Sequence, residues 1–389
     1  MDDSVIALLP SSIREWRRRL DLSGSVKNIS IDWEANRHLS VSLDLQGVRM
    51  TLPPELLPND FWSRYRNQGY EPSPDAPRMI VSSGNVLFQG GLLSFHDLKG
   101  HFTSDSDEQL TNVPFVFNFA FHQIPGDLLQ YNDLAEQLRL LPFTMSLVTD
   151  DFVIGTEPGQ STQADLPKIV AQILSMFRVI TCTVATQIYA TRAAPEGDVA
   201  MPINFEGQLK ISDASGAYEG FPYPLSSLGA LVGFKIDSGD TSVRVLSLNA
   251  RGSGKSTIRI VGDVIPSSDG SKVDMKLTAS ELPLDRNLID AMPPDTAQSM
   301  RSLFARHGAD EFATGDGAPE AHEVVDLNLQ ILRDPGPDRP TRLQGMIDFE
   351  EMNLTWDSFP YPISLAAGRI HWVGDEMKLE NADGGPLLE

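Results

Sequence analysis

PFVFNFAF, at residues 114–121, sets four phenylalanines at alternate positions, namely Phe115, Phe117, Phe119 and Phe121. Successive side chains of a β-strand point to opposite faces of the sheet, so this spacing places all four rings on one face of a single strand. Four aromatic rings on one face need an apolar environment. The segment therefore predicts a strand that packs one side against a core.

The same alternation of apolar and polar residues recurs in other parts of the chain, for example at residues 29–33, 39–45 and 325–331. Helical patterns are fewer and short, and they fall at residues 12–20, 126–138, 166–177 and 295–306. Thirty glycines and 27 prolines indicate many turns. Together these patterns predict a mainly β protein made of repeated antiparallel strands, with a few short α-helices.

An internal repeat of about 140 residues is visible in FPYP, which occurs at residues 221–224 and again 138 positions later at 359–362. We interpret FPYP as a proline-rich turn. Each copy is followed by a glycine, Gly229 or Gly368, that we expect to introduce a strand, and Gly84 marks a third copy near the front. The repeat predicts three similar β modules.

The predicted modules are a partial first repeat at 1–125 with a short N-terminal helix, a second at 126–281 with helices near 126–138 and 166–177, and a truncated third at 282–389 with a helix near 295–306. With these repeat boundaries, the chain begins inside one repeat and stops inside another. We therefore expect a piece of a longer protein. The alternative is a complete three-module β protein with atypical ends.

The formal net charge of −22 argues against a nucleic-acid partner, because binding phosphate needs a positive field. The single cysteine, Cys182, excludes an intramolecular disulfide and leaves the compartment open. No apolar segment reaches the roughly 18 to 20 residues that span a bilayer. Four arginines in the predicted first helix, Arg14 and Arg17 to Arg19, suggest either contact with anionic headgroups at a membrane surface or simply an exposed helix face.

GSGKST, at residues 252–257, resembles the end of a nucleotide-binding loop. A Walker A loop needs its first glycine five residues before Gly254, and that position holds Asn249. Such a loop also opens a helix, whereas residues 256–264 alternate like a strand. We therefore predict a glycine-rich hairpin and no nucleotide site, and expect Lys255→Ala to leave folding nearly unchanged.

Residues for catalysis or metal binding form no recognisable constellation. The seven histidines are scattered without ligand spacing, SDSDE at 104–108 lacks the remaining features of a calcium loop, and no nucleophile elbow is present. The sequence predicts a protein that is not an enzyme, with no cofactor and no metal.

The segment ELPLDRNLIDAMPPDTAQSMRSLFARHG, at residues 281–308, together with FEEMNLTWDSFPYPISLAAGRIHWVGDEMKLENADGG, at 349–385, resembles the C-terminal repeats of AsmA-like proteins, a family that includes AsmA and TamB. The shared features are a Leu-Pro-x-Asp entry to a helix at Leu282, Pro283 and Asp285, a helix closed by Gly308, and FPYP followed by a glycine-started strand.

This resemblance implies a curved, groove-like sheet lined by apolar side chains, on the periplasmic side of the cell envelope, anchored in the inner membrane through a segment outside this chain. It further implies transport of phospholipid or another acyl-chain lipid and a part in outer-membrane biogenesis. Protein partners are not indicated. The candidate lining residues are the strand aromatics and aliphatics Ile29, Ile31, Trp33, Val86, Phe88, Phe115, Phe117, Phe119, Phe121, Ile370 and Trp372.

The alternative function is a structural or adhesive β-repeat protein. In that case the apolar strand faces close on each other as ordinary sandwich cores, and no ligand groove exists. The pattern of alternating residues is the same in both cases, so both hypotheses stand.

Overall fold

The computed structural model describes most of the strands and two helices of the chain. The described residues are 23–33, 39–51, 78–103, 113–124, 140–155, 168–179, 181–197, 199–237, 240–265, 270–292, 294, 297–298, 301, 324–336, 339–356, 359–373 and 376–381. The predicted helices at 12–20 and 126–138, the arginines at 14 and 17–19, and SDSDE at 104–108 lie outside these residues. Of the predicted helix at 295–306, residues 297, 298 and 301 are described, and they are helical.

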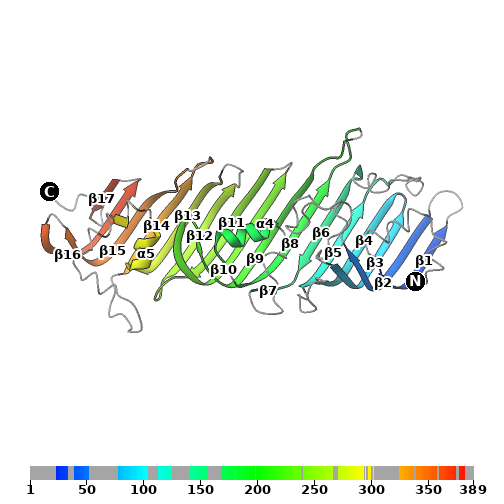
Figure 1. Cartoon of the computed structure of the whole chain (residues 1–389), viewed down its shortest axis with the longest axis horizontal. Coiled ribbons are helices and arrows are strands. Elements are labelled where there is room, and N and C mark those ends of the chain that lie inside the picture. The colour runs from blue at the N-terminus through cyan, green and yellow to red at the C-terminus, as the bar shows by residue number, and fades with distance from the viewer. Residues whose placement is uncertain are drawn as a thin grey trace. The chain divides into compact units, whose positions relative to one another are not determined.

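The described strands form one open antiparallel sheet of 17 strands, in which neighbours in the chain are mostly neighbours in the sheet (Figure 1). The first eight are β1 (Ser23–Trp33), β2 (Leu39–Thr51), β3 (Arg78–Gln89), β4 (Leu92–Thr103), β5 (Val113–Phe121), β6 (Phe143–Thr149), β7 (Phe152–Ile154) and β8 (Cys182–Arg192). The others are β9 (Ile203–Tyr218), β10 (Phe221–Asp237), β11 (Asp240–Arg251), β12 (Thr257–Ile265), β13 (Lys272–Pro283), β14 (Val324–Arg333), β15 (Arg342–Trp356), β16 (Phe359–Val373) and β17 (Glu376–Glu380). The predicted fold class, mainly β with repeated antiparallel strands and few short helices, is confirmed.

Two compact units divide the chain. Unit 1 comprises Met1–Leu174, Thr181–Lys210 and Phe234–Asp240, and unit 2 comprises Ser175–Ile180, Ile211–Gly233 and Thr241–Glu389. In unit 1, β1 to β6 pair in chain order, and β6 and β7 both pair with β8. In unit 2, β11 to β17 pair in chain order. The division into three repeats stays a prediction.

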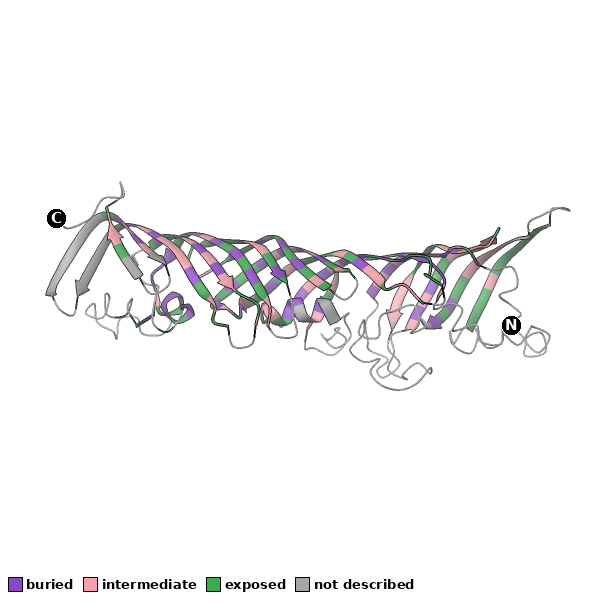
Figure 2. Cartoon of the chain, turned by 90° about the horizontal axis from the view of Figure 1, so that it is seen from above, coloured by how far each residue is buried: buried purple, intermediate pink, exposed green. Residues whose placement is uncertain are grey.

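Burial alternates along the strands as the sequence pattern predicts (Figure 2). In β5 every odd-numbered residue from Val113 to Phe121 is buried, and every residue between them is only partly covered. In β13, Val273, Met275 and Leu277 are likewise buried, whereas Lys272, Asp274 and Lys276 are exposed. Each unit therefore has an apolar sheet face and a polar sheet face, and the core lies on the apolar one.

Residues in the left-handed conformation interrupt the alternation without mixing the two faces. Asp97 has a φ of 48°, and the register of β4 against β5 shifts between Phe95 and Leu98. Its backbone N–H donates to Oδ1 of Asn118 on β5 at 2.8 Å. The extra residue of such a bulge moves the apolar positions from odd to even numbers, so the face stays apolar beyond it.

Unit 2 uses the same device in β13. Glu281 has a φ of 52°, the register against β14 shifts between Ala279 and Leu282, and the Glu281 N–H donates to Oδ1 of Asp326 at 3.1 Å. In both units a polar side chain of the neighbouring strand thus satisfies the N–H that the bulge releases from the ladder.

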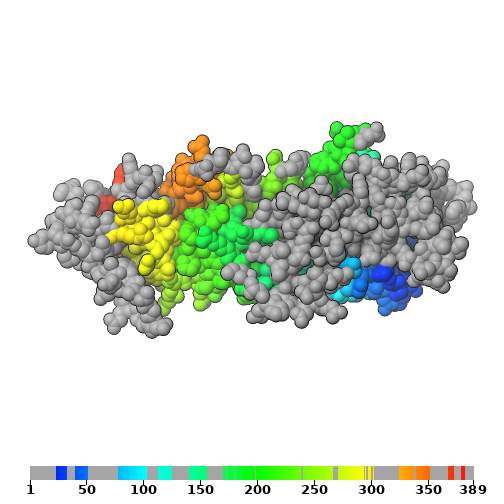
Figure 3. All heavy atoms as spheres, viewed as in Figure 1, coloured from blue at the N-terminus to red at the C-terminus, as the bar shows by residue number. Residues whose placement is uncertain are grey.

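Two short helices lie on the apolar side. The predicted helix at 166–177 is confirmed as α4 (Lys168–Met176), which buries Val170, Ile173 and Leu174. The Leu-Pro-x-Asp entry is confirmed too, because α5 (Arg286–Ala291) begins directly after Asp285, whose side chain accepts a hydrogen bond from the Leu288 N–H. In Figure 3 the yellow atoms of α5 are visible on the side of unit 2 that faces the viewer.

FPYP is not a turn, contrary to prediction. Both copies lie inside strands, β10 and β16, and Gly229 and Gly368 lie within the same strands rather than at their start. In β10, Phe221 and Tyr223 are buried while the prolines between them are exposed. Prolines two residues apart turn their nitrogens toward the same neighbouring strand, so the missing donors interrupt only one side of the ladder. The alternation of buried and exposed residues in FPYP therefore makes it a strand despite its two prolines.

Candidate functional site

Strand register in unit 1 aligns apolar residues into continuous rows across the sheet. Directly paired residues of antiparallel strands share a face. One row contains Ile31, Val41, Phe88, Leu93, Phe121 and Phe143, and the next contains Ile29, Leu43, Val86, Phe95, Phe119 and Met145. The register thus brings together six of the predicted lining residues, namely Ile29, Ile31, Val86, Phe88, Phe119 and Phe121. We call these two rows the apolar rows.

Exposure along the apolar rows changes steadily from one end to the other. Ile29 and Ile31 on β1 are 63% and 64% exposed, the row members on β2, β3 and β4 are partly covered, and Phe119 and Phe121 on β5 are 4% and 1% exposed. The blue atoms of the first strands are visible at the surface in Figure 3. An apolar surface of unit 1 therefore starts open to solvent at β1 and runs into a closed core at β5.

The closed end of the rows is a cluster of aromatic rings. The Phe119 ring lies 4.6 Å from Phe121, 5.3 Å from Phe143, and 6.1 Å from both Phe95 and Phe117, measured between centroids. Edge-on and offset stacked contacts of this kind favour aromatic pairs beyond the area that they bury. Phe119 is the centre of this cluster.

Arg192 on β8 shares the apolar face at this end, and the sequence analysis missed it. Its register partner is Phe143, its guanidinium carbon lies 4.8 Å from the Phe143 ring centroid, and its Nε donates to the Leu141 carbonyl at 2.8 Å. The residue is only 4% exposed. The alternation along β8 could have identified it, because Arg192 follows Ile188 and Ala190 at the next buried position.

The opposite face of the same strands is polar and hydrogen-bonded. Asp44 on β2 accepts hydrogen bonds from Asn28 on β1 at 2.8 Å and from Asn85 on β3 at 3.0 Å. These two hydrogen bonds, the one from Asn28 first, lower the pKa of the Asp44 carboxyl, so it is ionised at neutral pH. The first strands of unit 1 thus carry opposite chemistry on their two faces.

The remaining predicted lining residues do not join the apolar rows. Phe115 and Phe117 extend the buried face of β5 away from the rows. Ile370 lies in unit 2, where it is 2% exposed and pairs with Ile347 of β15. Trp33 lies on β1 and Trp372 on β16, but their side chains are outside the described part of the structure.

The GSGKST segment forms the predicted hairpin. Arg251 pairs with Thr257 across the turn, and β12 follows where a phosphate loop would open a helix. The Ser256 side chain is fully buried and donates to the Ser253 carbonyl at 2.8 Å, and the Ser253 N–H donates to the Tyr223 hydroxyl at 3.1 Å. The FPYP tyrosine therefore holds this turn, a contact that the sequence did not indicate.

Lys255→Ala is expected to change the free energy of unfolding by less than about 0.5 kcal/mol, because Lys255 is exposed at the tip of the turn. Ser256→Ala is the matched variant and is expected to cost about 1 kcal/mol, since it removes a hydrogen bond from a fully buried side chain. Urea denaturation of the two variants checks this ranking. A larger loss for Lys255→Ala than for Ser256→Ala would show that the lysine has a role that the hairpin does not explain.

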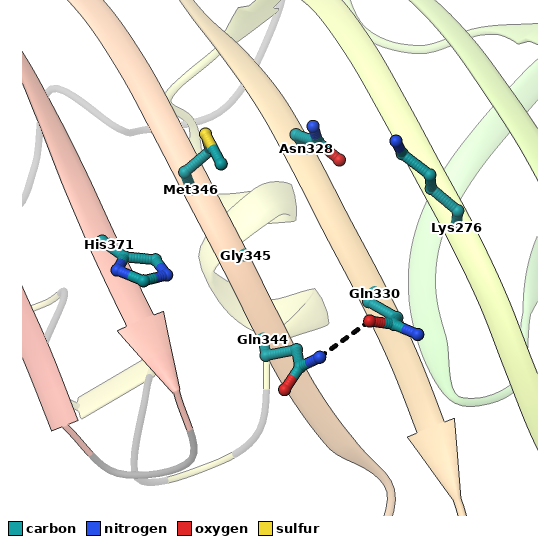
Figure 4. Close-up of a pocket in the computed structure, with 7 residues that line it drawn as sticks. All are labelled: Lys276, Asn328, Gln330, Gln344, Gly345, Met346 and His371. Carbon is teal, nitrogen blue, oxygen red and sulfur yellow. Dashed lines mark hydrogen bonds between the residues drawn. The ribbon is translucent and has the colours of Figure 1, made fainter.

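A concavity with a volume of about 400 Å³ lies on the polar face of unit 2 (Figure 4). It is lined by Lys276, Asn328, Gln330, Gln344, Gly345, Met346 and His371. Gln344 donates to Gln330 at 2.7 Å and Gln330 donates to Asp274 at 2.9 Å, a ladder of side chains across three strands. These hydrogen bonds link β13, β14 and β15 on the polar face, beside Lys276 and His371.

The described residues contain neither a metal-binding cluster nor a membrane-spanning helix. They contain no group of three or more histidine, cysteine or acidic side chains placed to hold a metal ion, and none of their helices is long and apolar enough to cross a bilayer. Burial raises the pKa of the Cys182 thiol to about 11, which keeps it protonated at neutral pH. Comparison of the chain with protein-family models, curated protein sequences and solved structures gave no match.

Proposed function

We propose that the chain binds the acyl chains of a lipid along the apolar rows of unit 1, without catalysing a reaction. The observation that carries this proposal is the gradient of exposure from Ile31 at 64% to Phe121 at 1% along one register row. Exposed isoleucines that continue without interruption into a phenylalanine core give an acyl chain an apolar path with an open entrance. Each CH₂ group that leaves water there contributes about 0.8 kcal/mol.

The surrounding chemistry supports a lipid rather than a polar ligand. On β1 to β3 the hydrogen-bonding groups, including Asn28, Asp44 and Asn85, lie on the opposite face. A lipid on the apolar rows would meet mainly aliphatic and aromatic carbon. A phospholipid in transit between membranes of a cell envelope is the ligand that the likeness to AsmA-like repeats suggests, and we propose a role in outer-membrane biogenesis on the same ground.

The second candidate function is a structural or adhesive β-repeat protein with a closed core. The observation that favours it is the burial in unit 2, where Met275, Leu329, Ile331 and Ile347 are at most 1% exposed. An apolar face that is covered in this way needs no ligand. This alternative does not explain why the apolar rows of unit 1 are open to solvent.

Lipid extraction separates the two functions. The purified chain is expected to release stoichiometric lipid into organic solvent, detected by mass spectrometry, and after delipidation to take up a fluorescent phospholipid. Protein that carries no lipid and takes none up would contradict the lipid-binding proposal and favour the closed structural protein.

A charge on β1 tests where the lipid enters. Ile31→Glu is expected to lower the uptake of fluorescent phospholipid by about tenfold or more, because a carboxylate is costly to place against acyl chains. Its effect on folding is expected to be small, since Ile31 is already 64% exposed. Ser30→Glu is the matched control, since it adds the same charge to the other face of the same strand. Equal uptake by the two variants would move the entrance away from β1.

A further inference from the structure

Two arginines, Arg333 and Arg339, lie close together in unit 2. Arg333 ends β14 two residues after Ile331 and pairs with Val273 of β13, so it shares the apolar face of unit 2. Arg339 follows in the connection between β14 and β15. Neither arginine makes a hydrogen bond or ion pair in the described part of the structure, whereas Arg342 nearby is bound to Asp334 at 2.7 Å.

A contact between two glycines brings the arginines to one place. A Cβ atom on Gly270 would lie 2.6 Å from the Gly336 carbonyl oxygen and 3.5 Å from Nη2 of Arg333. A Cβ atom on Gly336 would lie 3.2 Å from Cγ and 3.5 Å from Nε of Arg339. Gly270 and Gly336 therefore touch, and one guanidinium lies against each of them.

Arg333 carries one donor that is shielded from solvent, its Nε–H. Its Nε is shielded from solvent and has no hydrogen-bond partner among the described residues. A buried N–H without an acceptor is costly, and a charged one more so. The Arg333 charge also reaches the buried Tyr218 phenol, whose pKa is raised mainly by burial and in part lowered by this arginine. The Nε of Arg333 is thus shielded, while the residue as a whole is half-buried.

We propose that Arg333 and Arg339 form a binding site for a phosphate group. Guanidinium groups present planar pairs of donors that match the oxygens of phosphate, and two of them supply the charge that a dianion needs. A bound phosphate would provide the acceptor that Nε of Arg333 lacks. The chain carries a net charge of −22, so two neighbouring arginines with no acidic partner among the described residues are contrary to its overall composition.

The phosphate belongs either to a free anion or to the headgroup of a phospholipid, and the chemistry at the arginines is the same. The proposal does not depend on lipid binding by the apolar rows, because it rests on residues of unit 2 alone. Binding therefore has to be measured with both kinds of probe.

Titration with inorganic phosphate at constant ionic strength tests the site itself. The wild-type chain is expected to bind phosphate, seen by calorimetry and as a rise in the Tm of unit 2. Arg333→Met and Arg339→Gln are each expected to weaken this binding by about tenfold or more. Arg259→Gln is the matched control, because Arg259 is an exposed arginine of unit 2 on β12, and it is expected to bind like the wild type.

The source of the phosphate follows from a second pair of probes, short-chain phosphatidic acid and diacylglycerol with the same acyl chains. If phosphatidic acid binds more tightly than phosphate and Arg333→Met loses this binding, the site belongs to a lipid headgroup. If the two bind equally, the site belongs to free phosphate. Phosphate binding that survives both substitutions overturns the proposal, even where lipid uptake by unit 1 persists. So does a Tm several degrees lower for Arg333→Met without ligand, because removal of an unsatisfied donor does not destabilise a protein.

Discussion

Replacing Phe119 with alanine is expected to lower the free energy of unfolding of unit 1 by about 3 to 5 kcal/mol. Phe119 is 4% exposed, and four other phenylalanine rings surround it at 4.6 to 6.1 Å. Alanine would leave a cavity that these rings cannot refill without moving, because each is fixed to its own strand. The same substitution also removes the closed end of the apolar rows.

Hydrogen–deuterium exchange of β4 to β6, together with urea denaturation, measures this loss in the unit where it occurs. Val148→Ala on β6 is the control, because Val148 is 37% exposed on the other face, and it is expected to cost less than about 1 kcal/mol. Similar losses for the two variants would mean that the phenylalanine cluster does not hold unit 1 together.

Gly345→Ala is the second change with a large expected effect, about 3 kcal/mol or more in unit 2. A Cβ atom at Gly345 would lie 2.1 Å from the carbonyl oxygen of Asn328 and 3.0 Å from Cα of Leu329, on the neighbouring strand β14. Both are backbone atoms, which cannot turn aside as a flexible side chain does. The strands β14 and β15 would have to separate locally and lose ladder hydrogen bonds.

Gly229→Ala is its control within the same unit. There the nearest atom to a new Cβ is the Ile211 carbonyl oxygen at 3.8 Å, an ordinary contact, and the expected change is below about 1 kcal/mol. Exchange rates of β14 to β16 measure the Gly345→Ala variant, and those of β9 to β11 measure the Gly229→Ala control. A Gly345→Ala protein with unchanged exchange would show that these strands are less closely packed than the structure has them.

Much of the fold follows from short-range chemistry that a sequence displays. Alternation in PFVFNFAF predicts β5 because a period of two belongs to strands alone, and the capping chemistry of Asp285 predicts where α5 begins. Proline usually marks turns and therefore predicts a turn at FPYP, whereas the buried side chains of Phe221 and Tyr223 place it in a strand.

The candidate sites were less predictable because they depend on register. Ile31 and Phe121 belong to one row only through three intervening strands, and no local pattern gives the pairing of each. The degree of exposure of Ile31 likewise depends on which segments cover the strand. Arg333 and Arg339 meet through a contact of Gly270 with Gly336, residues 66 positions apart in the chain.

The bulges at Asp97 and Glu281 also bear on how such a long meander finds its pairing. A regular strand that slips by one residue keeps nearly all of its backbone hydrogen bonds, so many wrong alignments of a repetitive sheet lie close in energy. A bulge whose N–H has one acceptor, Asn118 or Asp326, loses that bond on any slip. These two side chains therefore fix the register of their strands. We expect unit 1 with Asn118→Ala and unit 2 with Asp326→Ala to refold to a mixture of registers before they lose much stability.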